Sequence, residues 1–182
     1  YDGRLVPQGV SAELIADRWG LTRGELDAFS AESHQRAARA WKDGLFEGEV
    51  SYVNDLHVDE TVRPDTTPES LAELRLAFRN EHLAARFPDL DWKVTAGNSS
   101  PVNDGSAAVL LAGEDAARRL GLTPRARVHS FAVVGDDPVL MLTAIIPATA
   151  KVLARAGLSI DDIELFEVNE AFASVVLAWQ RE

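Results

Sequence analysis

Apolar positions in the first third of the chain recur at helical spacing. A capping box of Thr22 and Glu25 precedes one such run, and a second run follows Thr67-Pro68-Glu69-Ser70, where an N-cap, a proline and an acidic first turn coincide. The intervening residues 47–65 are polar and acidic, apart from a short strand-like run at 50–53. The pattern predicts a mostly helical region with long connections, with helices over residues 11–20, 22–44 and from 68 onward.

After Pro88 the pattern changes to short apolar runs that alternate with helical segments. Such alternation is typical of a sheet covered by helices, so the sequence predicts an α/β fold. Turn-forming residues gather at 98–105 and 136–138 and mark two expected boundaries. The expected strands are 92–95, 125–134 and 163–168, and the expected helices are 114–120, 147–156 and 170–179.

Composition and charge narrow the class of protein. The 182 residues are 46% hydrophobic and 26% charged, as in ordinary soluble globular proteins. The 18 Lys and Arg against 29 Asp and Glu give a net charge of −11, which argues against a nucleic-acid partner because phosphate contacts require clustered cations. No window approaches the roughly 18 apolar residues of a membrane helix, so we expect no membrane partner and a cytoplasmic protein.

The types of residue present restrict the chemistry further. The absence of cysteine excludes disulfides, thiolate zinc sites and a cysteine nucleophile within these residues, and no cluster of metal ligands is visible. We expect His34, His57, His82 and His129 to be surface or helix-face residues. The first residues, Tyr1-Asp2-Gly3-Arg4, have neither a signal-peptide layout nor an initiator methionine, so we expect an upstream segment that has been removed or is not shown.

Two places in the sequence could carry polar chemistry. Asn169 lies between a predicted strand and a predicted helix, where it either caps the helix or turns its amide outward to hold a water or a substrate. The turn over residues 96–105 contains two Asn, two Ser and an Asp, which either line a polar pocket or form a tight loop with Asx-turn hydrogen bonds. Spacing alone favours the structural alternative in both places.

Two longer motifs are shared with a known family. Thr95-Ala96-Gly97-Asn98-Ser99-Ser100, continued by Asn103-Asp104-Gly105-Ser106-Ala107-Ala108, and the downstream Asn169-Glu170-Ala171-Phe172-Ala173 closely resemble the thiolases. Residues 59–64 and 69–78 resemble the loop domain of that family, and the similar segments follow in family order along nearly the whole chain. Thiolases exchange acyl groups between coenzyme A thioesters through a cysteine-bound intermediate. They either cleave 3-ketoacyl-CoA or condense two acetyl-CoA units.

The resemblance also implies an architecture. The family fold has α-β-α-β-α layering, with a mostly helical loop domain inserted in the first half. Residues 1–97 would belong to this loop domain, residues 98–136 would end the N-terminal half, and residues 137–182 would start the C-terminal half. The implied substrate is coenzyme A or an acyl-CoA, with no permanently bound cofactor, and the implied assembly is a homodimer or homotetramer.

The resemblance assigns roles to individual residues. Asn169 would hold a catalytic water beside the thioester oxyanion, where pre-oriented donors accelerate the reaction. In the coenzyme A site, Ser100 would contact the pantetheine arm. Arg63 and Ser70 of the loop domain would lie near the adenosine end, and Phe78 would pack on the ligand. The acyl pocket would include Phe172 and Met141, with Gln8 at a common methionine position and Leu142 in a run that is usually glycine-rich. The differences at Gln8 and Leu142 predict an altered acyl preference.

The family's nucleophilic cysteine, its second cysteine and its Gly-His-Pro segment have no counterpart in these 182 residues. The residues given are therefore not expected to catalyse acyl transfer alone, and the simplest interpretation is a portion of a longer thiolase. One alternative is a non-catalytic relative that binds acyl-CoA or lipid. Another is a structural module that uses the fold for assembly.

Overall fold

Seven α-helices and two short 3-10 helices make up the regular structure of residues 5–182, the part of the chain that this computed structural model describes. The α-helices are α1 (Gln8–Arg18), α2 (Arg23–Lys42), α3 (Pro68–Ala72), α4 (Glu81–Arg86), α5 (Glu114–Arg119), α6 (Ile145–Ala156) and α7 (Ala173–Arg181). The 3-10 helices are η1 (Ala96–Asn98) and η2 (Ile160–Asp162). None of the helices in this part of the chain is both long and apolar enough to cross a bilayer.

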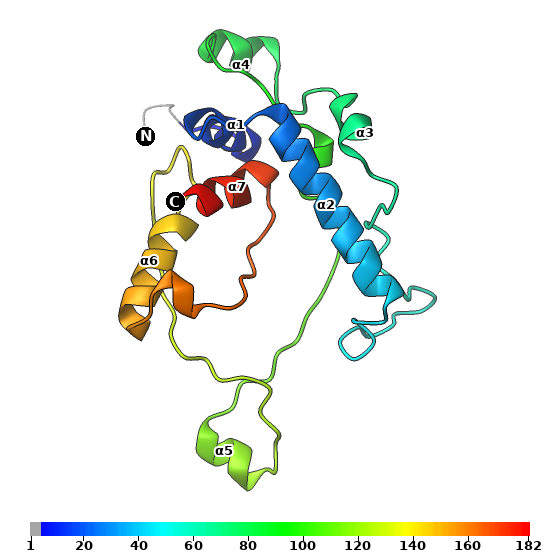
Figure 1. Cartoon of the computed structure of the whole chain (residues 1–182), viewed down its shortest axis with the longest axis vertical. Helices are drawn as coiled ribbons and strands as arrows, with labels where there is room; N and C mark the ends of the chain where they lie inside the picture. The colour runs from blue at the N-terminus through cyan, green and yellow to red at the C-terminus, as the bar shows by residue number, and fades with distance from the viewer. Residues whose placement is uncertain (1–4) are drawn as a thin grey trace.

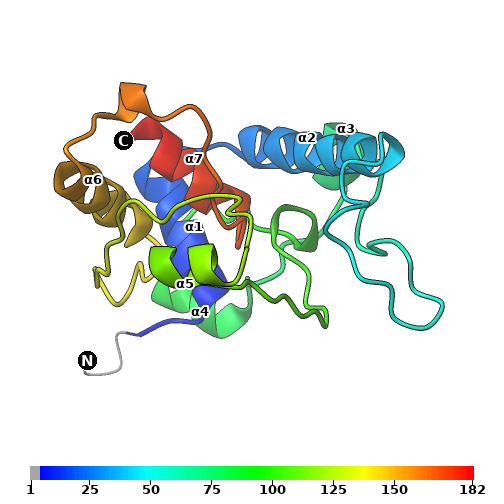
Figure 2. The same ribbon diagram turned by 90° about the horizontal axis from the view of Figure 1, so that it is seen from below.

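The core lies between α1 and α7, which are side by side although one begins the described chain and the other ends it (Figures 1 and 2). The Ser174 hydroxyl on α7 donates to the carbonyl of Ala12 on α1 at 2.9 Å. A second apolar cluster attaches the start of α2 to the same pair of helices. The main cluster contains Ala12, Ile15, Val94, Leu140, Phe172, Val175 and Ala178, and the second contains Ala16, Leu21, Leu26 and Ala173.

Local capping signals set several helix ends, as predicted. Thr22 and Glu25 form a reciprocal capping box at the start of α2, with the Thr22 N–H donating to the Glu25 carboxylate at 2.7 Å. Gly157 ends α6 with a φ of 68°, a left-handed conformation that favours glycine. Two helix starts are corrections, because α1 begins at Gln8 rather than at the predicted residue 11, and α7 begins at Ala173 rather than at the predicted residue 170.

The predicted strands are wrong within residues 5–182, where pairing is limited to three isolated bridges, Val53 with Leu56, Leu76 with Thr95, and Ser99 with Phe172. Apolar runs favour extended backbone, but a strand also needs a neighbour about 4.8 Å away to pair its N–H and C=O groups. Residues 125–134 and 163–168 find no such neighbour here. Figure 1 shows that two long segments without regular structure lead to α5, which is set apart from the other helices.

Candidate functional site

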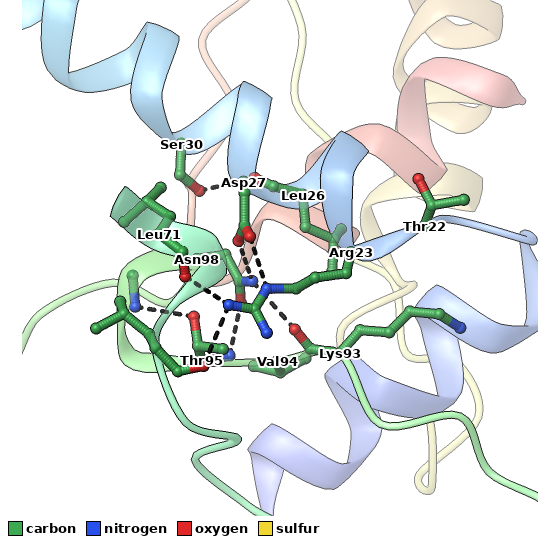
Figure 3. Close-up of polar contacts among 12 residues, drawn as sticks. Thr22, Arg23, Leu26, Asp27, Ser30, Leu71, Lys93, Val94, Thr95 and Asn98 are labelled. Atoms are coloured by element: carbon green, nitrogen blue, oxygen red, sulfur yellow. Dashed lines mark hydrogen bonds and ion pairs between the residues drawn. The ribbon is translucent and has the colours of Figure 1, made fainter. Parts of the chain in front are cut away.

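The turn at η1 is built around the buried amide of Asn98, whose side chain is 2% exposed (Figure 3). Its Nδ2 donates to Asp27 Oδ1 at 2.9 Å and to the Lys93 carbonyl at 3.2 Å, while its Oδ1 accepts from the Thr95 N–H at 2.9 Å. The Ser99 hydroxyl donates to the Thr95 carbonyl at 2.6 Å. The side chains of Asn98 and Ser99 therefore form a tight loop and do not line a polar pocket.

Asp27 connects this turn to α2 and α3. Its carboxylate is 1% exposed, and its second oxygen accepts from Arg23 Nε at 2.6 Å. The Arg23 guanidinium then donates to the carbonyls of Leu71 at 2.5 Å and Leu74 at 3.2 Å. A buried carboxylate with both oxygens bonded to donors is stable only while the network is intact, so α2, α3 and the turn form one rigid unit.

The segment before the turn is held by a second buried carboxylate, Glu13 of α1. Its oxygens accept from the backbone N–H groups of Lys93 at 2.7 Å and Val94 at 2.8 Å. Burial raises the pKa of Glu13, and the two backbone hydrogen bonds oppose that rise. Glu13 therefore supplies the acceptors that a neighbouring strand would supply in a sheet.

The turn meets the second sequence motif directly. Ser99 and Phe172 form an antiparallel bridge, and the Ser100 N–H donates to the Ala171 carbonyl at 3.0 Å. Phe172 is buried in the main core, where its ring stands edge-on to Phe78 with the centroids 5.9 Å apart.

The other residues predicted for the pocket are Leu142, Gln8 and Met141, of which Gln8 and Met141 are exposed. Leu142 is half-buried against the same core cluster. The Phe78 ring lies over Gly9 of α1, and Gln8 is the residue just before Gly9. Met141 is 37% exposed, has a φ of 34°, and donates its N–H to the Asp137 carbonyl at 2.7 Å. The fold thus gathers Phe78, Phe172 and Leu142 and leaves Met141 at their edge.

Asn169 does not cap α7, because Phe172 occupies the N-cap position and the helix starts at Ala173. Its side chain is exposed and forms no hydrogen bond with any of residues 5–182. The residue lines an open groove of about 410 Å³ between the 163–169 segment, α6 and α7. The groove is mostly apolar, with lining residues Ala132, Ile145, Ala148, Thr149, Val152, Leu153, Ile163, Phe166, Glu167, Val168, Asn169 and Trp179.

Arg63 and Ser70 lie on another side, against or near α2. Arg63 is exposed, and its backbone N–H donates to His34 Nδ1 at 3.3 Å. The Ser70 hydroxyl takes part in the α3 capping box with Thr67, accepting from its N–H at 3.1 Å and donating to its carbonyl at 2.9 Å. Within the described residues, no hydrogen bond, ion pair or ring contact joins either side chain to Phe78, Phe172 or Asn169.

Three polar residues with structural roles were not identified from the sequence. Glu13 and Asp27 are charged residues within buried helix faces, a signal that periodicity analysis could have flagged. Ser33 donates its hydroxyl to Glu170 Oε2 at 2.7 Å across 137 positions, and no local pattern announces such a contact. In the part of the chain described, no three His, Asp or Glu side chains are grouped to hold a metal ion.

Family comparisons agree with this arrangement of motifs. The family model for the N-terminal domain of thiolase matches residues 4–115, and the model for its C-terminal domain matches residues 122–182. The chain therefore belongs to the thiolase family, as the two motifs predicted.

Individual relatives are similar along most of this chain. It is 42% identical over 175 residues to a 3-ketoacyl-CoA thiolase of Idiomarina loihiensis, and 43% identical over 178 residues to one of Escherichia coli. These matches cover 91% and 93% of this chain but 43% and 44% of the relatives. The chain thus spans less than half the length of the curated relatives it matches.

Solved structures support the predicted fold class. The dimeric peroxisomal thiolase of Saccharomyces cerevisiae matches 98% of this chain with a TM-score of 0.87 and 37% identity. Human mitochondrial 3-ketoacyl-CoA thiolase matches 97% with a TM-score of 0.85 and 37% identity. Each match covers 44% of the solved chain. The thiolase-like α/β fold is confirmed, although the ladders of its sheets are not formed within residues 5–182.

Proposed function

We propose that this chain is a portion of a thiolase that moves acyl groups between coenzyme A thioesters, by thiolysis of 3-ketoacyl-CoA or by condensation of acetyl-CoA. The names of the relatives, 3-ketoacyl-CoA thiolase among them, support this reaction class and a role in fatty acid metabolism. The observation that carries the proposal is the side chain of Asn169, which is exposed at a groove and has no partner within residues 5–182.

Asn169 is proposed to orient the water that stabilises the thioester oxyanion. Negative charge on that oxygen is greatest in the transition state, so a donor fixed in advance stabilises the transition state more than the substrate. The end of the Asn169 segment is attached to the turn through Ser100 and Ala171. A fixed main chain beside an unpaired amide is what such a donor requires.

The remaining site residues are proposed to bind the substrate. Ser100 would contact the pantetheine arm, while Phe172, Met141, Leu142 and Gln8 would shape the acyl pocket. Near the adenosine end, Arg63 and Ser70 would contact coenzyme A, and Phe78 would pack against the same ligand. The exposure of Arg63 supports this role, because a chain with a net charge of −11 needs a local cation to attract a phosphorylated ligand.

The proposal extends to organisation and assembly. Helices α1 to α4 fall within residues 1–97, the proposed loop domain, and residues 98–136 and 137–182 are proposed to belong to the two thiolase halves. The yeast relative is described as dimeric, which supports a homodimer, with a homotetramer as the other possibility. A cytoplasmic location without a nucleic-acid partner or a permanent cofactor completes the proposal.

The test is a thiolysis assay of the polypeptide that carries this sequence, with a 3-ketoacyl-CoA and free coenzyme A. We expect Asn169→Ala to lower kcat by about 10–1000-fold, the range for a lost oxyanion contact. The matched control is Gln180→Ala, which removes an exposed amide at the far end of α7 and should leave kcat unchanged. An unchanged kcat in Asn169→Ala contradicts the assigned role, and an inactive wild type contradicts the proposed function.

The alternative is a relative that binds acyl-CoA or lipid without transferring the acyl group. The absence of cysteine from these residues favours it only if the rest of the polypeptide also lacks a thiol nucleophile. Incubation of the polypeptide with acetyl-CoA separates the two functions. Release of coenzyme A with a matching gain of one acetyl group in protein mass supports transfer. Saturable binding with neither change supports the alternative.

A further inference from the structure

The backbone around Asn169 receives little support from secondary structure. Residues 163–170 belong neither to a helix nor to a ladder, and α7 begins only at Ala173. Asn169 itself makes no side-chain hydrogen bond within the described chain. The direction of its amide is therefore set by what holds its neighbours.

Two contacts hold those neighbours from different elements. On one side the turn fixes the main chain through the Ser100 N–H and the Ala171 carbonyl, 3.0 Å apart. On the other, the Ser33 hydroxyl of α2 donates to Glu170 Oε2 at 2.7 Å. The second contact is closer in sequence to Asn169, since Glu170 is the adjacent residue.

Asn169 and Glu170 occupy different depressions of the surface. Asn169 lines the groove beside α6 and α7, while Glu170 lines a separate recess of about 120 Å³ against α2. The main chain between the two residues is shared, so the contact that holds Glu170 on the α2 side also restrains Asn169 beside the groove.

Charged side chains of α2 line the recess that holds Glu170. Arg36 lines the same recess and bonds to Glu32 at 2.5 Å. The negative charge of Glu170 also acts on His34, whose pKa it tends to raise. Because hydrogen bonds to ionised acceptors are short and strong, the Ser33 contact can fix one carboxylate position even near the surface.

We propose that Ser33 and Glu170 are positioning residues for Asn169, holding its backbone against α2 so that the amide faces the thioester. This inference rests on the proposed function. It concerns a pair that acts through Asn169 and does not itself touch the substrate.

The activity test uses the polypeptide that carries this sequence. Ser33→Ala and Glu170→Ala should each lower kcat by roughly tenfold, which is less than the 100-fold loss expected when a catalytic group is misplaced by about 1 Å. Each should change the KM for coenzyme A by less than about twofold. The double variant should lose no more than the worse single variant, because the two residues act as one contact. Ser33→Thr and Glu170→Gln keep a donor and an acceptor and should retain most of kcat.

Ser30→Ala is the matched control. Ser30 lies on the same helix, but its hydroxyl donates to the Leu26 carbonyl of α2 at 3.0 Å. The same substitution there should leave kcat unchanged. A fall in kcat equal to that of Ser33→Ala would mean that general loosening of α2 causes both effects, and the positioning role would be overturned.

Hydrogen exchange provides a measurement that does not depend on activity. Amides in residues 166–172 should exchange faster in Ser33→Ala than in wild type or Ser30→Ala, with no change in the core of α1. Raised exchange with unchanged kcat refutes positioning, and unchanged exchange refutes the contact itself. If wild type transfers no acyl group, the proposed function fails, and exchange alone decides whether Ser33 holds the segment.

Discussion

Glu13 is a carboxylate in the middle of the buried face of α1. It is fully buried, next to Ala12 in the sequence, and both of its oxygens accept backbone N–H groups from residues 93 and 94. Burial raises the pKa of Glu13 because the charged form is desolvated, and hydrogen bonds to the carboxylate act in the opposite direction. The Glu13 side chain thus attaches to α1 a segment whose strand pairing is limited to the bridge between Leu76 and Thr95.

Replacing Glu13 by glutamine tests this attachment. The amide keeps only one acceptor oxygen and presents a donor to the other backbone N–H, so a buried donor loses its partner. We expect Glu13→Gln to lower the free energy of unfolding by about 1–3 kcal/mol, measured by urea denaturation.

The matched control is Glu114→Gln, which removes the charge of an 81% exposed carboxylate paired with Arg118 at 2.9 Å. Its unfolding midpoint should stay close to that of wild type, since exposed ion pairs stabilise little. Equal losses in the two variants would show that charge, and not the two buried contacts, is what Glu13 contributes.

Helix α2 contacts several of the segments that carry predicted site residues. Asp27 bonds to Asn98 of the turn, Ser33 to Glu170, and the neighbouring His34 accepts the N–H of Arg63. Asp27 and His34 lie seven positions apart, close to two helical turns, which places them along one side of the helix, whereas Ser33 is turned by about 100° from His34 onto the neighbouring side. The long helix thereby aligns the turn, the Asn169 segment and the Arg63 loop.

The contact at His34 predicts a dependence on pH. Burial and, less strongly, the Arg63 charge lower the pKa of His34 below its usual 6.5, although Glu170 and Asp59 oppose them. Neutral Nδ1 accepts the Arg63 N–H, whereas the protonated ring cannot. The unfolded chain therefore binds the proton more tightly than the folded chain. The contribution of His34 to stability is complete above pH 6.5 and is lost as the pH falls through the folded value.

We expect the urea midpoint of wild type to decrease between pH 7.5 and 5.5 by more than that of His34→Gln, whose amide oxygen can accept the same N–H at both pH values. His82→Gln is the control, because it makes the same substitution at an exposed histidine of α4. Identical pH profiles for wild type and His34→Gln would show that the ring does not titrate with folding.

Local signals were predictable from the sequence, and contacts between distant segments were not. The Thr22 and Thr67 capping boxes and the Gly157 helix end depend on residues within four positions, and all three are confirmed. The strands at 125–134 and 163–168 depend on partners that an apolar run cannot identify. The bond from Asn98 to Asp27 spans 71 positions, so the turn was correctly placed while its buried anchor was missed.

The predictions for the site divide in the same way, into local motifs and contacts between distant segments. The two motifs identified the family, whereas the bridge between Ser99 and Phe172 that joins them came from the structure. The structural alternative for Asn169 was wrong, because the start of α7 depends on core packing of residues 173–178 and not on the nearest capping residue. The roles of Asn169, Arg63 and the acyl-pocket residues remain predictions.

At the scale of the whole molecule, the segments without regular structure expose a large apolar surface. Val128, Phe131 and Leu165 are 69%, 71% and 89% exposed, and Val109, Leu110 and Leu111 are also exposed. Unpaired backbone groups beside apolar side chains attract other strands. Lys151 and Arg155 of α6 satisfy only two of these backbone carbonyls, those of Val133 and Phe131, at 2.8 and 2.9 Å. The relatives are more than twice as long as the chain matched to them, which fits segments that pair with residues outside this sequence.

The 182 residues expressed alone are therefore expected to self-associate and to bind an apolar dye such as ANS, because the exposed runs have no partner within the described chain. Sedimentation velocity over a range of concentrations should show species well above the 19.8 kDa monomer. Phe131→Lys with Leu165→Lys should reduce both association and dye binding, because charge on an unpaired apolar run opposes strand addition. Arg125→Lys, which changes no apolar surface, should change neither. A monodisperse monomer of 19.8 kDa without dye binding would show that these segments need no pairing, and would remove the main physical support for a longer folded unit.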